Sequence, residues 1–178
     1  SGVGTACIQL TQISGATAFV PAGNEEKLRR CRELGAKLAI NYKEEDFLEK
    51  VLAATNGEGV DLIIDPVGGA YLARNIKVLR PFGRLVNIGL LSGGQGELDM
   101  GRLLRHRLRL VGSTLRNRPL AEKIEITRQF ESRFWHLFAT GELQPIVDTV
   151  FPIQEAQQAH AYVAQDKNVG KVVLEIRD

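Results

Sequence analysis

The sequence opens with a run that has the composition of a phosphate-binding turn, Ser1-Gly2-Val3-Gly4. Glycines at the first β-to-α turn of a nucleotide-binding domain let a pyrophosphate lie against bare backbone at a helix N-terminus. Only two of the three fingerprint glycines are present, because Cys7 stands where Gly or Ala is usual. Short Gly-x-Gly turns also occur without a ligand, but here an amphipathic run follows at once. We therefore expect these four residues to bind a pyrophosphate.

The end of the next predicted strand lacks the acidic residue that usually holds the ribose 2′-hydroxyl of NAD. Ala22-Gly23-Asn24 stands there instead, Lys27 lies one turn into the following helix, and Tyr42 ends the third strand. An ammonium and a phenol hydroxyl suit a 2′-phosphate, so the pattern predicts NADPH as the cofactor. The alternatives are that Lys27 is a solvated helix lysine and Tyr42 a rim aromatic. Glu25 or Glu26 turned inward would also oppose a phosphate.

Three further strand ends carry loop glycines. They are Asp65-Pro66-Val67-Gly68-Gly69, the run 88–94 that contains Gly89 and Leu90, and Gly112-Ser113-Thr114-Leu115. Because ligands bind outside the carboxyl ends of the strands in a doubly wound sheet, we expect these loops to lie on the rim that receives the ribose and nicotinamide. Asp65 has a second interpretation, which we favour, as a cap of the following helix.

The elements that must position these residues alternate along the chain. The patterns predict strands at 17–21, 38–41, 60–65, 84–89 and 108–115, helices at 25–34, 45–55, 70–79, 100–107 and 121–140, and a turn at 80–83. Strands that alternate with helices of about 10–15 residues indicate βαβ units and a parallel sheet. Since the crossovers are right-handed, the predicted fold is a doubly wound α/β Rossmann domain.

The pattern changes after Gly141, where a strand at 147–152, a helix at 153–166 and a strand at 171–176 follow. We expect residues 1–141 to form the NADP-binding domain and residues 142–178 to return toward a neighbouring domain. Because a glycine turn normally follows a strand, the opening also suggests a fragment whose first, central strand is missing. Such a core would have an unpaired gap in its sheet.

Composition excludes several classes of protein. The 178 residues are about one domain, and 44% hydrophobic with 25% charged residues is typical of globular proteins. A net charge of +2 is too small to indicate nucleic acid or an anionic membrane as the partner, and no apolar stretch approaches the about 18 residues of a membrane span. Two cysteines and no signal peptide predict a reducing cytoplasm.

At this point the chain resembles a known family. Three runs carry the resemblance, Ser1–Leu10, Ala22–Lys27 and Asn41–Phe47, and later stretches support it at 112–118, 156–160 and 168–171. Together they resemble the zeta-crystallin-like quinone oxidoreductases of the zinc-independent medium-chain dehydrogenase/reductase superfamily, with the tumour-suppressor-inducible subgroup nearest in pattern. The resemblance covers essentially the whole chain.

The resemblance implies a GroES-like catalytic domain, absent here, that wraps a Rossmann domain and leaves NADPH in the cleft between them. It implies hydride transfer to a quinone-like acceptor, and a homodimer formed by edge pairing of the predicted outermost strand, Leu108–Gly112. It places Ser1 to Gly4 on the pyrophosphate and Asn24, Lys27 and Tyr42 at the 2′-phosphate. Gly68, Gly89 and Leu90 would lie along the ribose, and Ser113, Thr114 and Leu115 near the nicotinamide.

Other chemistries lack anchors in this sequence. His106, His136 and His160 have no metal-ligand spacing, no hydrolase or NTPase motif is present, and the basic run 102–109 reads as a solvated face. We name no catalytic residue and no metal ligand, and we expect the fragment alone to be inactive. The open alternatives are an enoyl reductase or alcohol dehydrogenase of the same superfamily, a non-catalytic NADPH-binding protein, and a methyltransferase, which the missing acid disfavours.

Overall fold

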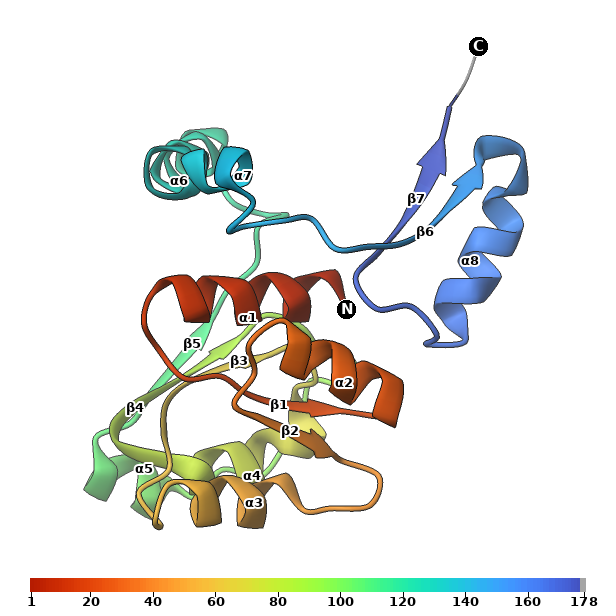
Figure 1. The fold of residues 1–178 in the computed structure, drawn as a ribbon. Helices are drawn as coiled ribbons and strands as arrows, with labels where there is room; N and C mark the ends of the chain where they lie inside the picture. Colours follow the sequence, from red (N-terminus) through yellow and green to blue (C-terminus); the bar gives the residue numbers. More distant parts are fainter. Residues whose placement is uncertain (177–178) are drawn as a thin grey trace. The chain divides into compact units, whose positions relative to one another are not determined.

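The computed structural model describes residues 1–176 and forms two compact units. One unit holds residues 1–43 and the chain from residue 128 onward, and the other holds residues 44–127. Every strand pair in both units is parallel, and the strands form three separate sheets, β1-β2, β3-β4-β5 and β6-β7 (Figure 1). The predicted α/β class with parallel strands is therefore confirmed.

The first unit begins with α1 (Gly2–Ile13), β1 (Phe19–Ala22), α2 (Glu25–Glu33) and β2 (Leu38–Asn41). Helix α2 starts where predicted, because the Asn24 Oδ1 accepts from the Lys27 amide at 2.9 Å and two glutamates occupy the first turn. The apolar sides of α1 and α2 meet the strand residues in one buried core of Ile8, Leu28, Cys31, Ala36 and Ala39.

The same unit ends with β6 (Val147–Pro152), a 3₁₀ turn (Ile153–Glu155), α8 (Ala156–Ala164) and β7 (Lys171–Glu175). Helix α8 lies beside the β6-β7 pair (Figure 1). One carboxylate ties the three elements together, because Asp148 accepts from the Tyr162 hydroxyl at 2.9 Å and from the Val169 amide at 2.8 Å. The helix predicted over 153–166 is thus split into a 3₁₀ turn and a shorter α-helix.

The long helix predicted over 121–140 is also divided, into α6 (Leu120–Phe134) and α7 (His136–Thr140). The break is a single tightened turn at Trp135, whose carbonyl accepts from the Phe138 amide three residues later at 3.2 Å. The rings of Trp135 and Phe138 pack edge to face across this turn at 5.6 Å. Gly141 ends α7 in the left-handed conformation, as its place in the sequence predicts.

The second unit contains α3 (Phe47–Ala54), β3 (Val60–Asp65), α4 (Gly69–Val78), β4 (Leu79–Asn87), α5 (Met100–His106) and β5 (Arg109–Gly112). Its sheet has the order β3-β4-β5, with α3, α4 and α5 together on one side of it (Figure 1). The core under these helices is built from Ile76, Leu79, Leu85 and Leu108. Strand β3 has the predicted bounds, and α3, α4, α5 and β5 agree within a few residues.

The turn predicted at residues 80–83 is instead part of β4. The strand register jumps from the pair Val60 and Leu79 to the pair Leu62 and Arg84, so the extra residues of β4 form a bulge. Phe82 supplies the bend with a φ of 66°, and the Arg107 guanidinium lies 4.1 Å above its ring. The backbone does bend at these residues, but β4 continues through the bend because it pairs with β3 both before and after the bulge.

The basic run at 102–109 is not wholly a solvated face. Arg102 reaches back to the end of α4, where Nε donates to the Ile76 carbonyl at 2.8 Å and Nη2 donates to the carbonyls of Lys77 and Leu79 at 2.7 and 3.1 Å. Carbonyls at a helix end lack intrahelical donors. Arg102 therefore has a structural role, because it supplies hydrogen-bond donors to the backbone carbonyls where α4 passes into β4.

Candidate functional site

The residues predicted to form a glycine turn lie inside the first turn of α1. Ser1 is the N-cap, and its Oγ accepts from the Gly4 amide at 3.1 Å while its carbonyl accepts from the Thr5 amide at 3.0 Å. The amides of Gly2 and Val3 lie in the first turn of the helix, where no helix carbonyl is available as their acceptor. The glycines are thus helical, and their amides point out of the helix start, where an anion is stabilised.

Lys171 lies against this helix start, a residue that sequence reasoning did not assign to the site. A Cβ built on Gly2 would lie 2.4 Å from the Lys171 Cε and 3.0 Å from its Nζ, so the absence of a side chain at position 2 admits the lysine. The Lys171 ammonium therefore lies at the N-terminus of α1.

The signal for Lys171 was in the sequence only as part of the run 168–171 that carries the family resemblance. Its position is set by Gly170, whose φ is 95° and whose added Cβ would lie 2.2 Å from the Ile146 carbonyl oxygen. The Lys171 amide donates to the same carbonyl at 2.8 Å. This tight approach aims the start of β7 at Gly2, which no spacing in the sequence reveals.

Strands β1 and β2 end side by side, because Ala22 pairs with Asn41. The residues that follow them, Gly23 and Tyr42, lie close together. A Cβ on Gly23 would lie 2.7 Å from the Tyr42 hydroxyl oxygen, so only glycine leaves room for the phenol there. Asn24, which is predicted to contact the 2′-phosphate, is also the N-cap of α2.

Lys27 does not project freely into solvent, as the alternative interpretation required. Its side chain is 12% exposed, and its ammonium forms an ion pair with Asp166 at 2.7 Å. Glu25, the nearest potential opponent of a phosphate, is turned along α2 and pairs with Arg32 at 2.7 Å. Glu26 lies near the Tyr162 hydroxyl, whose pKa is raised first by the hydrogen bond to Asp148 and more weakly by Glu26.

In the second unit, the three strands end at a common edge. Asp65 of β3 pairs with Asn87 of β4, and Asn87 pairs with Gly112 of β5. The loops that contain the predicted residues all start from that edge, as expected for parallel strands. The structure therefore brings together the starts of the three loops within this unit.

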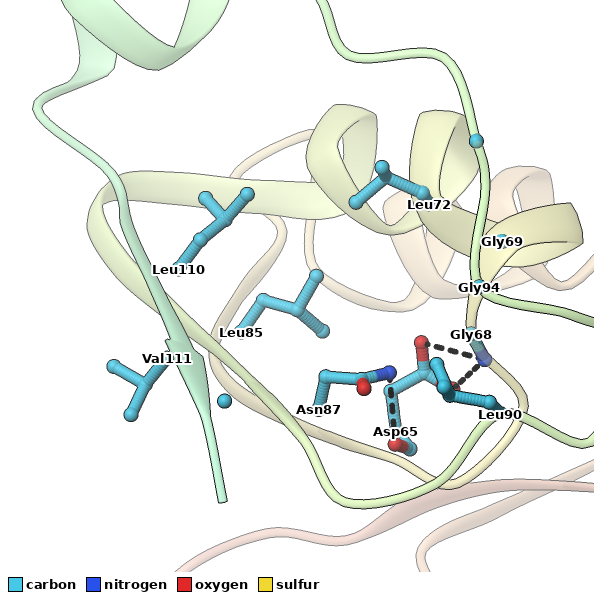
Figure 2. A pocket seen from close by; sticks show the side chains of 12 residues that line it. Asp65, Gly68, Gly69, Leu72, Leu85, Asn87, Leu90, Gly94, Leu110 and Val111 are labelled. Atoms are coloured by element: carbon cyan, nitrogen blue, oxygen red, sulfur yellow. Dashed lines mark hydrogen bonds between the residues drawn. The ribbon is translucent and has the colours of Figure 1, made fainter. Parts of the chain in front are cut away.

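Asp65 holds the first of these loops. Asp65 is 4% exposed, and its carboxylate accepts from the Gly68 amide at 3.1 Å (Figure 2). It also accepts from the Val67 amide at 2.7 Å and from the Asn75 side chain at 3.1 Å. The favoured interpretation of Asp65 as the cap of α4 is wrong, because the N-cap is Gly68 and no side chain among the described residues caps that helix. Asp65 instead bonds to the loop amides that precede the helix. It organises the backbone instead of offering a free carboxylate to a ligand.

Gly68 and Gly89 lie where two loops run backbone against backbone. Gly68 has a φ of 88°, and a Cβ on Gly89 would lie 2.6 Å from the Pro66 carbonyl oxygen. The contact continues as the Ser92 amide donates to the Val67 carbonyl at 2.8 Å. Close loop packing is thus a sufficient reason for these glycines, and their predicted place along a ribose stays a prediction.

A cavity of about 230 Å³ opens beside these loops (Figure 2). Its lining is mostly apolar, with Asp65 and Asn87 as its polar side chains, and consists of Asp65, Gly68, Gly69, Leu72, Leu85, Asn87, Leu90, Gly94, Gly96, Leu110, Val111 and Gly112. Of the predicted residues, Gly68 and Leu90 line it. Gly89 and the residues 113–115 do not.

The loop after β5 is held by an arginine that the sequence analysis did not single out. The Ser113 amide donates to the Asn87 carbonyl at 2.9 Å, and Arg118 donates through Nε to the Thr114 carbonyl at 3.1 Å. Arg118 also pairs with Glu122 at 2.8 Å, which fixes its guanidinium. Leu115 is exposed. The predicted role of residues 113–115 near a nicotinamide remains untested.

Metal and thiol chemistry have little basis in the part of the chain that the structure describes. Within residues 1–176 no three His, Cys, Asp or Glu side chains are grouped to hold a metal ion. Burial raises the pKa of both Cys7 and Cys31, which disfavours the reactive thiolate. No helix in this range has the length and apolar character to cross a membrane.

Comparison with known proteins extends over both units. A family model described as zinc-binding dehydrogenase matches residues 2–131. The 2-haloacrylate reductase of Burkholderia sp. is 32% identical over 178 residues, which cover 97% of this chain and 52% of that protein. The chain thus spans about half the length of this relative.

Two solved structures are similar over 99% of the chain. The Escherichia coli quinone oxidoreductase complexed with NADPH has a TM-score of 0.83 at 26% identity, and 54% of that chain is covered. An NAD-dependent alcohol dehydrogenase has a TM-score of 0.83 at 32% identity, and 49% of that chain is covered. The predicted Rossmann-like NAD(P)-binding fold is confirmed by these matches.

Proposed function

From the premise that this chain belongs to the zinc-binding dehydrogenase family, as the cofactor-binding domain of a medium-chain oxidoreductase, we propose that it binds NADPH. We propose further that the intact protein passes a hydride from NADPH to a quinone-like acceptor. The observation that carries the cofactor assignment is the Lys27 side chain, 12% exposed in the first turn of α2, directly after a strand, β1, that no carboxylate ends. Zinc does not fit the described residues, and no step of the proposal uses it.

The residues of the first unit fit the phosphates of a dinucleotide. The free amides of Gly2 and Val3 and the ammonium of Lys171 would hold the pyrophosphate, because all three are donors at a helix N-terminus. Lys27 and Tyr42 would serve the 2′-phosphate. By resemblance, the second unit would offer Gly68, Gly89 and Leu90 to the ribose and residues 113–115 to the nicotinamide.

The bound dinucleotide supplies the hydride, so the protein contributes binding, orientation and exclusion of water. Helix amides are fixed donors that need no reorganisation when an anion arrives. The ion pair of Glu25 with Arg32 lies along α2, and that of Arg118 with Glu122 joins the loop after β5 to α6, so these nearby charges are already paired. No side chain of this chain is assigned to proton transfer.

The cofactor assignment is tested by titrating NADPH and NADH into the intact protein and its Lys27→Ala variant at fixed ionic strength. A charge-assisted hydrogen bond contributes about 1.5–3 kcal/mol, so NADPH affinity should fall about 10- to 100-fold while NADH affinity stays nearly constant. Lys37→Ala is the matched control, because Lys37 is exposed at the opposite end of β2 from Tyr42. Equal wild-type affinities, or equal losses of both cofactors, would contradict the assignment.

A second candidate follows from the relatives. The name of the 32% identical 2-haloacrylate reductase favours an unsaturated acid as the acceptor, and that of the alcohol dehydrogenase favours an alcohol. A panel of quinones, enoyl thioesters, 2-haloacrylates and aldehydes, with oxidation of NADPH as the readout, separates these activities. Turnover of enoyl compounds without quinones would replace the quinone proposal. Tight NADPH binding without any turnover would indicate a non-catalytic binding protein.

A further inference from the structure

Asp166 lies on the turn after α8, 139 residues from Lys27 along the chain, and no sequence motif gives it a role. Its carboxylate meets the Lys27 ammonium at 2.7 Å, and its backbone carbonyl accepts from the same ammonium. The two side chains differ sharply in environment, because that of Lys27 is 12% exposed and that of Asp166 is 77% exposed. The cation is sheltered, whereas its counterion stands in water.

The backbone presents both acceptors of Asp166 to the lysine. Asp166 adopts the left-handed conformation with a φ of 53°, directly after Gln165 caps α8. Its amide donates to the Val163 carbonyl at 2.9 Å, which anchors the turn to the helix. Aspartate and asparagine tolerate this conformation better than most residues. The carboxylate is therefore held beside Lys27 by a formed turn.

We propose that Asp166 is an internal counterion that competes with the 2′-phosphate for Lys27 and so limits the preference of this protein for NADPH over NADH. The inference rests on the proposed function, since it concerns the same lysine. A lysine ammonium has three donors, and that of Lys27 donates to the Asp166 carbonyl while its charge is paired with the Asp166 carboxylate. A phosphate that approaches Lys27 must displace the carboxylate or accept its repulsion.

The cost of that competition falls on the phosphate alone. The Asp166 carboxylate is mostly in water and can turn away from Lys27. The cost of binding the phosphate is therefore the lost ion pair and the remaining like-charge repulsion. NADH has a neutral 2′-hydroxyl and does not meet this repulsion. The ion pair also keeps the ammonium in place when no cofactor is bound, because Lys27 is too buried to be solvated freely.

The test measures 2′,5′-ADP and 5′-ADP binding to the intact protein by titration calorimetry, which needs no turnover. Asp166→Asn keeps the left-handed turn and removes the charge, and Asp166→Gly removes the side chain while the carbonyl contact remains. Both variants should bind 2′,5′-ADP about 3- to 10-fold more tightly, with 5′-ADP within about 2-fold of wild type. Glu142→Gln makes the same change of charge after α7 and should alter neither ligand.

The Lys27→Ala background separates competition from a general electrostatic effect. There, Asp166→Asn should no longer tighten 2′,5′-ADP, because the shared ammonium is gone. If the wild type prefers 2′,5′-ADP through Lys27 but Asp166→Asn leaves that affinity unchanged or weakens it, Asp166 does not compete and the proposed function stands. If the wild type shows no preference for 2′,5′-ADP, the NADPH assignment and this inference both fail.

Discussion

Gly2 and Gly4 occupy the same helical turn but have different surroundings. A Cβ on Gly2 would displace the Lys171 side chain, whereas a Cβ on Gly4 would meet only the Ser1 Oγ, at an ordinary contact distance of 3.4 Å. Among residues 1–176, therefore, no contact requires glycine at position 4. A ligand that approaches the start of α1 closely would explain why glycine stands at position 4.

Gly4→Val is expected to weaken binding of 2′,5′-ADP at least about 10-fold while the fold is retained, since valine is no worse than glycine inside a helix. Gly4→Ala should give a smaller loss, because a steric effect grows with the side chain. Calorimetry gives the affinities, and thermal unfolding by circular dichroism checks the fold. Unchanged affinity in the valine variant would show that no phosphate approaches Gly4.

At the scale of elements, the joint between α4 and β4 depends on a side chain from α5. Ile76 and Leu79 are fully buried, so their carbonyls cannot turn to water if the Arg102 guanidinium is removed. The same helix also carries Arg105, which has no such carbonyl partners among the hydrogen bonds of the described residues. The two arginines form a natural comparison.

Arg102→Ala is expected to lower the free energy of unfolding by about 2–3 kcal/mol, because buried carbonyls lose a charged donor. Arg105→Ala should stay within about 0.5 kcal/mol of wild type. Arg102→Lys should fall between them, since a single ammonium cannot reproduce the planar fork of the guanidinium. Urea unfolding followed by circular dichroism measures all three, and equal effects of both alanine variants would contradict the structural role of Arg102.

At the scale of the whole molecule, β5 is an edge strand, because no other strand of residues 1–176 pairs with its outer side. Two apolar residues of this strand, Leu110 and Val111, are 39% and 42% exposed. Because the Ser113 amide donates to Asn87 of β4, alternation along the strand turns the Val111 amide toward β4 and the Leu110 amide outward. We propose that this outward side pairs with a second copy of the chain and forms a homodimer with a continuous sheet.

Leu110→Pro should therefore convert the dimer of the intact protein to monomers while the β4-β5 pairing survives, since proline removes only the outward donor. Leu110→Val keeps the amide and should remain dimeric. Multi-angle light scattering gives the mass of each. A proline variant that stays dimeric would place the interface elsewhere.

The sequence alone determined most of the local elements. Asn24, two glutamates and Gly35 predicted both ends of α2, and the bounds of β2 and β3 were predicted residue for residue. These signals are local, because caps, turns and periodicity act over a few neighbouring residues. Where pairing with a distant strand intervened, as at the bulge around Phe82, the predicted turn was wrong because β4 continues through it.

Only the tertiary structure decided what the candidate site residues touch. Lys27 meets Asp166, 139 residues away, and Lys171 lies against Gly2. The Gln9 side chain likewise exchanges two hydrogen bonds with the backbone of Gln144, at 3.0 and 2.9 Å and 135 residues away. Such contacts depend on the path of the whole chain through space. Residue type and spacing indicated which side chains could bind a phosphate, and the fold determined which charges surround them.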